Sequence, residues 1–356
     1  MTAGCRKLAA VSFTAKGCRL NALLCQALSR EGYDVEAWGK EPYAGEQGLT
    51  PLTEPLKDWT GRMFQEKEGI LFIGASGIAV RSIAPFVQSK DKDPAIVVMD
   101  EKGMFAISLM SGHLGGANEL AGTLANLTGA IPVITTATDV NGKFAVDVFA
   151  KKQGLHLGSL KEAKHVSADI LDEKQVGVLS EFPVEGPVPE ELTILKDGEP
   201  FDGKTGMVIS LNEEKTPFVH TLHLVPRIVT LGLGCRKGKP EEEIEEAVFS
   251  LLQRNHLSIH SVKQVSSIDL KKEEPGILAF CQKYQLPFVT YSAEELLQVK
   301  GEFSASEFVK SITGVDNVCE RSALLASGYG TMIQKKSAGN GVTAALCLEK
   351  WSVDFE

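Results

Sequence analysis

The sequence lacks the short motifs by which proteins most often bind metals. None of the seven cysteines forms a Cys-x-x-Cys pair, and this odd number without close spacing is typical of reduced thiols in a cytosolic protein. Two histidine pairs have the spacing of metal ligands, His220 with His223 and His256 with His260. Neither pair has a cysteine nearby or the His-Glu-x-x-His pattern, so we interpret both as incidental and predict no metal site.

Positive charge and long apolar runs are also scarce. Lys and Arg number 37 against 46 Asp and Glu, a formal net charge of −9, which argues against a dedicated nucleic-acid binder because such a protein needs a basic face. The longest apolar stretch, residues 70–87, is interrupted by Arg81 and Pro85 and is too broken for a membrane span. No signal peptide is recognisable near the N-terminus, so we predict a cytoplasmic protein without membrane contact.

The composition is otherwise that of a globular protein, with 43% hydrophobic and 23% charged residues, and 356 residues exceed one typical domain. Alternating strand and helix patterns predict an N-terminal α/β domain over residues 1–140 and a C-terminal α/β domain over 226–356. A less periodic middle region over 141–225 joins them. We therefore predict a multi-domain α/β fold with mainly parallel sheets, plus hairpins at 94–110 and 331–349.

Residues 111–118, Ser-Gly-His-Leu-Gly-Gly-Ala-Asn, are the segment best suited to catalysis. His113 lies among small residues between a predicted strand and a predicted helix, where it is accessible as a general base. The amides of 115–117 can converge on an oxyanion, and the helix N-terminus is expected to lower the pKa of His113. Ser111 is a weaker candidate nucleophile, because no Gly-x-Ser-x-Gly elbow surrounds it. The alternative is a glycine turn with an incidental histidine.

A second glycine-rich loop, residues 232–238, lies between a predicted strand and a predicted helix. Its third glycine comes one residue too late for a dinucleotide fingerprint, and the loop fails the phosphate-loop pattern as well. Glutamates 241–243 would repel a phosphate placed at the N-terminus of the following helix. With Arg236 and Lys237 the loop can instead hold carboxylates, or it is only a tight turn with solvated basic residues.

Several other polar or flexible residues lie where predicted strands end, the edge at which open α/β sheets bind ligands, or where a short helix begins. They are Gly74, Ser76, Gly77, Arg81, Asp100, Thr136, Asp139, Glu320 and Arg321. For any one of them, helix capping or turn hydrogen bonding is an alternative to a functional role.

Taken in order, these motifs resemble the cobalt-precorrin-5A hydrolases of the anaerobic cobalamin (vitamin B12) pathway. The resemblance extends over most of the chain in three blocks, near residues 70–140, 141–225 and 226–356, and the stretches that carry it lie at residues 74–121, 132–139, 224–238, 318–327 and 341–349. The first stretch is long and specific. The resemblance implies an enzyme that hydrolyses a ring lactone of cobalt-precorrin-5A, cleaves a carbon–carbon bond and releases acetaldehyde, giving cobalt-precorrin-5B.

The resemblance also implies what the protein binds. The substrate is an anionic cobalt-tetrapyrrole with many carboxylates, and because it carries the cobalt, the enzyme needs no cofactor or metal of its own. Contacts with other enzymes of the pathway and a homodimer are left open. No nucleic-acid or membrane partner is expected.

Within this interpretation His113 deprotonates the attacking water, and Asp100, Asp139 or Glu320 moves further protons. The amides around Gly115 and Gly116 bind the oxyanion. The residues expected to contact the substrate are Gly74, Ser76, Gly77, Arg81, Ser111, Gly112, Gly115, Gly116, Asn118, Thr136, Gly232, Gly234, Arg236, Lys237 and Arg321. Two other functions stay open: a carrier or channelling protein that binds the tetrapyrrole without chemistry, and a nucleotide-dependent α/β enzyme.

Overall fold

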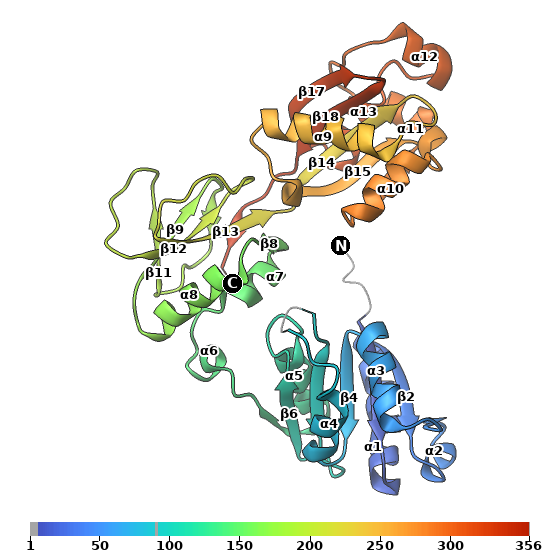
Figure 1. Ribbon diagram of the computed structural model, residues 1–356, viewed down its shortest axis with the longest axis vertical. Coiled ribbons are helices and arrows are strands. Elements are labelled where there is room, and N and C mark those ends of the chain that lie inside the picture. Colours follow the sequence, from blue (N-terminus) through green and yellow to red (C-terminus); the bar gives the residue numbers. More distant parts are fainter. Residues whose placement is uncertain (1–5, 90–91, 356) are drawn as a thin grey trace. The chain divides into compact units, whose positions relative to one another are not determined.

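The computed structural model describes residues 6–89 and 92–355, without the side chain of Phe308 (Figure 1). The chain divides into two compact units, Met1–Val148 and Phe149–Glu356. Both combine mainly parallel sheets with helices, so the predicted α/β class is confirmed. Among the described residues, no helix has the length and apolar character needed to cross a membrane.

The first unit contains a seven-stranded sheet in the order β3-β2-β1-β4-β5-β6-β7. Its strands are β1 (Lys7–Ser12), β2 (Asp34–Gly39), β3 (Thr50–Pro51), β4 (Gly69–Ile73), β5 (Ala95–Met99), β6 (Phe105–Met110) and β7 (Ile131–Val133). Its helices are α1 (Ala15–Arg30), α2 (Tyr43–Glu46), α3 (Leu56–Glu66), α4 (Ser76–Ile83), α5 (Ala117–Thr128), α6 (Ala137–Val140) and the start of α7 (Val146–Lys152). Among the strand pairs of the described residues of this unit, only β5–β6 is antiparallel, which confirms the predicted hairpin.

Helices cover both faces of this sheet. The central strands are buried on both sides, which is why they are continuous apolar runs in the sequence. Side chains alternate along β4, so that Leu71 and Ile73 join the core beneath α1 and α5, while Ile70 and Phe72 join the core beneath α3 and α4. The result is a three-layer arrangement whose loops, at the two ends of the strands, carry the polar candidates.

The second unit contains two five-stranded sheets. In the middle module, residues 149–226, the order is β11-β9-β12-β13-β8, and only β8 is antiparallel to its neighbour. Its elements are β8 (Leu155–Leu157), α8 (Leu160–Leu171), β9 (Val176–Ser180), β10 (Val184–Glu185), β11 (Leu192–Leu195), β12 (Thr205–Ile209) and β13 (His220–Pro226). Helix α8 packs against β12 and β13.

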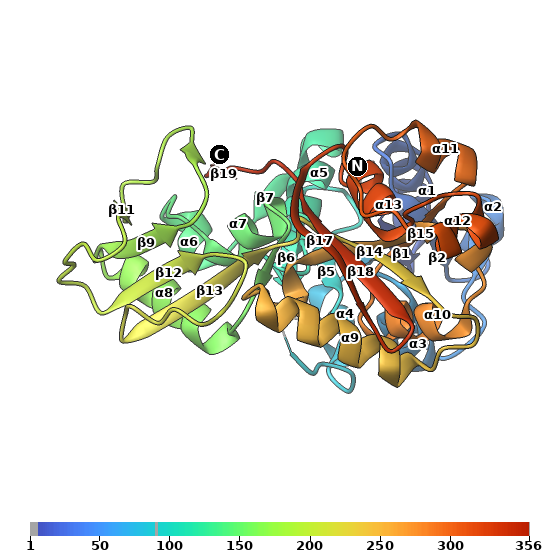
Figure 2. The same ribbon diagram turned by 90° about the horizontal axis from the view of Figure 1, so that it is seen from above.

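The C-terminal module, residues 229–348, has the sheet order β16-β15-β14-β18-β17. Its elements are β14 (Val229–Cys235), α9 (Glu241–Arg254), a 3-10 turn (Ile259–Ser261), β15 (Val262–Ile268), a second 3-10 turn (Asp269–Lys271), α10 (Pro275–Lys283), β16 (Phe288–Tyr291), α11 (Ala293–Gln298), α12 (Glu307–Thr313), α13 (Cys319–Ala326), β17 (Thr331–Gly339) and β18 (Val342–Leu348). Strands β17 and β18 lie side by side as the predicted terminal hairpin (Figure 2). Its turn, Asn340-Gly341, has φ values of 45° and 75°, as a type I′ turn requires.

The segment after β18 returns to the middle module. Strand β19 (Val353–Asp354) pairs in parallel with β10, and Val353 N donates a hydrogen bond of 2.8 Å to Pro183 O. Trp351 packs edge-on against Phe182, with ring centroids 5.0 Å apart. The two modules of the second unit are therefore joined twice, by the short connection between β13 and β14 and by this tail.

Candidate active site

His113 is held between two carboxylates. Its Nε2 lies 2.5 Å from Asp139 Oδ2, and its Nδ1 lies 3.1 Å from Asp147 Oδ1. The side chains of His113 and Asp147 are 13% and 11% exposed, whereas that of Asp139 is 36% exposed. The imidazole is therefore fixed from both sides, and Asp139 is the member of the group that meets solvent.

The two carboxylates shift the pKa of His113 in the direction opposite to the one expected from the sequence. The hydrogen bond with Asp147, assisted by the one with Asp139, outweighs partial burial and raises the pKa of His113 to about 9. The prediction of a lowered pKa is wrong, because two nearby negative charges act more strongly than the N-terminus of α5. At neutral pH the ring is thus an imidazolium, a proton donor in its resting state.

Asp139 stays ionised beside this cation. Burial by itself would raise the pKa of Asp139, but hydrogen bonds with Thr136 and His113 lower it below its usual range. Thr138 adds its hydroxyl, with Oγ1 3.3 Å from His113 Nε2. The pair therefore rests as imidazolium and carboxylate.

Asn118, in the first turn of α5, fixes the position of Asp139. Ser108 Oγ donates to Asn118 Oδ1 over 2.6 Å, so the amide nitrogen of Asn118 points the other way. That nitrogen donates to Thr136 Oγ1 over 2.8 Å and to Asp139 Oδ2 over 3.1 Å. The predicted residues His113, Asn118, Thr136 and Asp139 thus form one hydrogen-bonded group.

The backbone of the 111–118 loop is closed on itself. The amides of Gly116 and Ala117 donate to the carbonyl oxygens of His113 and Ser111, over 3.0 and 3.1 Å. The amides of Gly116 and Ala117 are thus used within the loop, and the oxyanion role expected for the amides of 115–117 stays a prediction. A Cβ on Gly115 would lie 2.4 Å from Ser111 Cβ, and one on Gly112 would lie 2.8 Å from Asn118 Oδ1. The small residues therefore make the tight loop possible.

The antiparallel strand β6 divides the strand-end candidates between two edges of the sheet. Met110, at the end of β6, pairs with Ile96, at the start of β5, so residues 111–118 lie at the edge where β5 begins. Strand β7 is parallel to β6 and brings Thr136 and Asp139 to the same edge. The loops after β4 and β5 lie at the opposite edge, with Gly74, Ser76, Gly77, Arg81 and Asp100. A single crevice lined by all these residues is therefore excluded.

At that opposite edge, Asp100 serves a turn. Its carboxylate accepts hydrogen bonds from the amides of Lys102, Met104 and Phe105 over 2.8–2.9 Å. These hydrogen bonds explain why an acid stands at the turn of the β5–β6 hairpin. Asp100 and His113 lie at opposite ends of this hairpin, so they are separated by its length. Arg81 is exposed beside Gly77.

Two predicted residues of α13, the proton-transfer candidate Glu320 and the substrate-contacting candidate Arg321, make their contacts within the C-terminal module. Glu320 is fully buried and accepts the amides of Ser304 and Lys336 over 3.0 and 2.7 Å. Arg321 donates to Asp316 over 3.0 Å and to two backbone carbonyls, with its guanidinium 4.3 Å from the ring centroid of Phe303. Both side chains therefore tie loops to α13.

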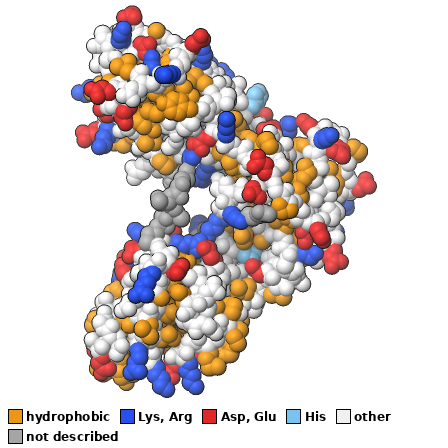
Figure 3. Space-filling view, turned by 180° about the vertical axis from the view of Figure 1, so that it is seen from behind, with side chains coloured by type: hydrophobic (Ala, Val, Ile, Leu, Met, Phe, Trp, Pro, Cys, Tyr) orange, Lys and Arg blue, Asp and Glu red, His pale blue; other side chains and the backbone are white. Residues whose placement is uncertain are grey.

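The 232–238 loop combines packing glycines with exposed cations. A Cβ on Gly232 would lie 1.9 Å from the carbonyl oxygen of Cys319, and one on Gly234 would lie 2.7 Å from Thr343 Oγ1. Arg236 and Lys237 are exposed, so their charges stay available to an anionic ligand. Lys and Arg side chains are interspersed with Asp and Glu on the face drawn in Figure 3.

Asp147 is the member of the site that sequence reasoning missed. It stands in the apolar run Val146-Asp147-Val148-Phe149, and a carboxylate in the first turn of a helix has an ordinary explanation in the helix dipole. No spacing relates it to His113, 34 residues earlier. Only the fold brings the two together.

Fold and site together are those of an α/β protein in which a histidine is held between two carboxylates. Three family models match the chain: cobalamin synthesis G N-terminal over residues 58–139, the cobalamin biosynthesis central region over 144–226, and cobalamin synthesis G C-terminus over 229–347. The chain belongs to this cobalamin synthesis G family.

Curated relatives carry the name of an enzyme. The cobalt-precorrin-5A hydrolase of Priestia megaterium is 33% identical over 317 residues, which cover 85% of this chain and 84% of the relative. That of Salmonella typhimurium is 34% identical over 314 residues, covering 85% and 88%. A crystal structure described as a cobalamin biosynthesis protein G homologue from Sulfolobus solfataricus is 21% identical, with a TM-score of 0.42 and coverage of 96% and 97%.

Proposed function

We propose that this protein hydrolyses cobalt-precorrin-5A, opening the ring lactone and cleaving a carbon–carbon bond so that acetaldehyde leaves and cobalt-precorrin-5B remains. The relatives' names support the substrate. The observation that carries the chemistry is His113 between Asp139 and Asp147, a charged acid–base pair with one member open to solvent. The cobalt belongs to the substrate, and no step requires a metal of the enzyme's own.

In the first step, water attacks the lactone carbonyl. Its oxygen adds to the carbonyl carbon while the proton it loses passes to Asp139. The lactone C–O bond then breaks, and the imidazolium of His113 gives its proton to the departing alkoxide. Positive charge on His113 also stabilises the oxyanion that forms on the way. A pKa of about 9 suits this role, because His113 enters protonated at neutral pH.

In the second step, the same histidine acts as a base. Neutral His113 lies beside the Asp147 carboxylate and protonated Asp139, and it takes the proton of the new hydroxyl group as the carbon–carbon bond breaks. Acetaldehyde leaves, and the electron pair stays on the conjugated ring, which then takes up the proton held by Asp139. One water is consumed, and His113 and Asp139 return to their starting states.

The proposal also assigns residues that bind the carboxylates of the substrate. The exposed cations Arg236 and Lys237 pair with carboxylates of the tetrapyrrole, since a local cluster of charge decides binding even in an acidic protein. All six described cysteines are free thiols, which supports action in the reducing cytoplasm beside other enzymes of the pathway.

The test is incubation of the purified chain with cobalt-precorrin-5A, followed by an assay for acetaldehyde. His113→Gln should lower turnover by about 10²–10⁴-fold while the tetrapyrrole still binds, because a general acid–base group contributes on that scale. If the parent chain binds the ring but releases no acetaldehyde, the protein is a carrier. If His113→Gln turns over at the parent rate, the acid–base centre lies elsewhere.

A further inference from the structure

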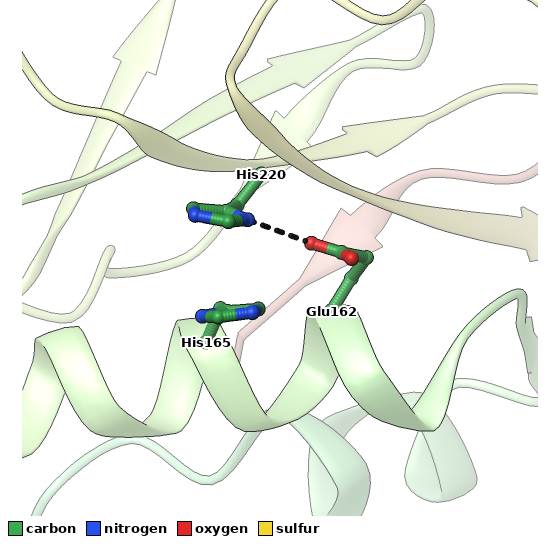
Figure 4. A group of neighbouring side chains, drawn as sticks. All are labelled: Glu162, His165 and His220. Atoms are coloured by element: carbon green, nitrogen blue, oxygen red, sulfur yellow. Dashed lines mark ion pairs between the residues drawn. The ribbon is translucent and has the colours of Figure 1, made fainter.

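Two histidines and a glutamate converge in the middle module, apart from the residues used above. Glu162 and His165 stand on α8, three residues apart and hence on one face of the helix, and His220 is the first residue of β13 (Figure 4). One potential ligand atom from each of the three side chains lies within 4.8 Å of the others. The interpretation of His220 and His223 as an incidental pair missed this group, because the partner of His220 comes from a different element.

One carboxylate oxygen of Glu162 lacks a hydrogen bond among the described residues. Glu162 Oε2 is buried, has no hydrogen-bond partner in the described part of the chain, and lies 3.3 Å from His220 Nδ1 without hydrogen-bond geometry. A buried carboxylate oxygen without a partner is costly, so its position calls for a cation or a donor that completes it.

Helix capping also leaves the Glu162 carboxylate available. Ser159 caps α8 and accepts the amide of Glu162 over 3.3 Å, the first half of a Ser-x-x-Glu capping box. The second half would be a bond from the Ser159 amide back to the carboxylate, and α8 does not form it, whereas Ser292 and Glu295 of α11 form both halves. The carboxylate turns toward His220 instead, as Figure 4 shows.

We propose that Glu162, His165 and His220 bind a divalent first-row transition metal of the zinc type. Two imidazoles and one carboxylate suit such ions, whereas magnesium and calcium prefer all-oxygen sites. Solvent supplies the remaining ligands. The site belongs to the middle module and takes no part in the hydrolysis proposed above.

Binding requires a small closure of the group. The His165 and His220 rings stack 3.8 Å apart at 16°, so one ring must tilt for both nitrogens to face one ion. Around zinc, with bonds of about 2.0–2.1 Å, ligand atoms lie about 3.4 Å apart, so the widest gap must shrink by at most about 1.4 Å. The side chains of His220 and Glu162 are 34% and 20% exposed, which leaves room for this motion. The ion then links α8 to β13.

The experiment measures zinc binding by the full chain without an affinity tag, after removal of metal with a chelator. Calorimetric titration with Zn²⁺ should give one site that is at least 10-fold weaker in His165→Ala and in His220→Ala. Glu162→Gln keeps the shape of the side chain and should weaken the same site. Because an ion that binds only the folded state stabilises it, Zn²⁺ should raise the Tm of the parent and not of these variants, and Mg²⁺ should leave it unchanged.

The matched control is His256→Ala. His256 Nδ1 lies 3.2 Å from Glu214 Oε2, much as His220 lies from Glu162, but this pair does not belong to a three-ligand group among the described residues. Its loss should leave zinc affinity at the parent value. Equal zinc affinity in the parent and all three site variants would overturn the proposal. A loss of zinc affinity in His256→Ala as large as that in the site variants would also overturn it. The Tm without metal reveals any variant that fails to fold. If the histidine variants fail to fold, the zinc affinity of Glu162→Gln tests the proposal.

Discussion

Asp147 Oδ1 lies 3.1 Å from His113 Nδ1, although the two residues are 34 positions apart in the chain. This contact supplies the second carboxylate of the site and holds the ring nitrogen that faces away from Asp139. It is also the largest cause of the raised pKa of His113. Several expectations about pH therefore depend on this one pair.

Replacing Asp147 should bring the histidine back toward its ordinary behaviour. In Asp147→Asn the pKa of His113 should fall from about 9 toward 6.5, because the dominant hydrogen bond to a charged acceptor is lost. Chemical shifts of the His113 ring nuclei, followed through a pH titration by NMR, measure this directly. Asp58→Asn, at the exposed start of α3, is the control and should leave the pKa of His113 unchanged. An unchanged value in Asp147→Asn would assign the shift to Asp139 alone.

The rate of acetaldehyde release should fall as pH rises through about 9. The reaction begins with protonated His113, and the acid form disappears above its pKa. A profile of kcat/KM against pH tests this for the free enzyme, and Asp147→Asn should move the alkaline limb to lower pH. A rate that instead rises between pH 6 and 7 would mean that a neutral histidine starts the reaction.

Stability should respond to the same titration. Since the folded pKa of His113 lies above the unfolded value of 6.5, the protonated ring stabilises the fold. That contribution is complete below about pH 6.5 and is lost as pH rises through about 9. Asp139, whose pKa is lowered, has the opposite pH dependence: its stabilising contribution is present at neutral pH and is lost as pH falls into the acidic range. Denaturant unfolding of the parent and of His113→Gln should therefore converge as pH rises across this window, and parallel curves would contradict the expectation.

Arg236 should matter for binding more than for chemistry. Arg236→Ala should raise KM by about 3- to 30-fold with kcat nearly kept, the pattern of a lost anchoring charge. Steady-state kinetics of acetaldehyde release separate the two constants. Arg30→Ala, an exposed cation at the end of α1, should change neither. A collapse of kcat at constant KM would place Arg236 at the reacting centre.

Gly232 should be required by packing. Gly232→Ala puts a methyl group 1.9 Å from the Cys319 carbonyl oxygen, a rigid backbone atom, so it should destabilise the second unit by about 1–3 kcal/mol or more. Gly339→Ala in β17 meets nothing within 4 Å and should be neutral or stabilising by about 0.5–1 kcal/mol. Calorimetric unfolding compares them. Equal stability of Gly232→Ala and the parent, with weakened substrate binding, would support the binding role expected from the sequence.

The sequence predicts those features that depend on local pattern. Continuous apolar runs give the central strands, and the small residues around His113 mark a tight loop between β6 and α5. His113, Asn118, Thr136 and Asp139 all follow strands that the sequence also indicates, and the structure brings them into one group.

What the sequence does not predict depends on contacts between distant segments. Antiparallel β6 sends its loop to the edge opposite Asp100, although both residues follow strand ends. The amides of Gly116 and Ala117 are used within the loop, which no residue pattern reveals. The charge state of His113 follows from Asp147, and an aspartate in a helical first turn looks ordinary on its own.

The pairing of β19 with β10 has a consequence for the order in which the chain is made. Residues 351–355 leave the ribosome after the whole C-terminal module, yet Trp351 packs on Phe182 and Phe355 stacks on Phe149, with ring centroids 4.9 Å apart. During synthesis the middle module must therefore wait, with these aromatic surfaces uncovered, until some 120 later residues have been added. The middle module can therefore be completed only after the C-terminal sheet has been translated.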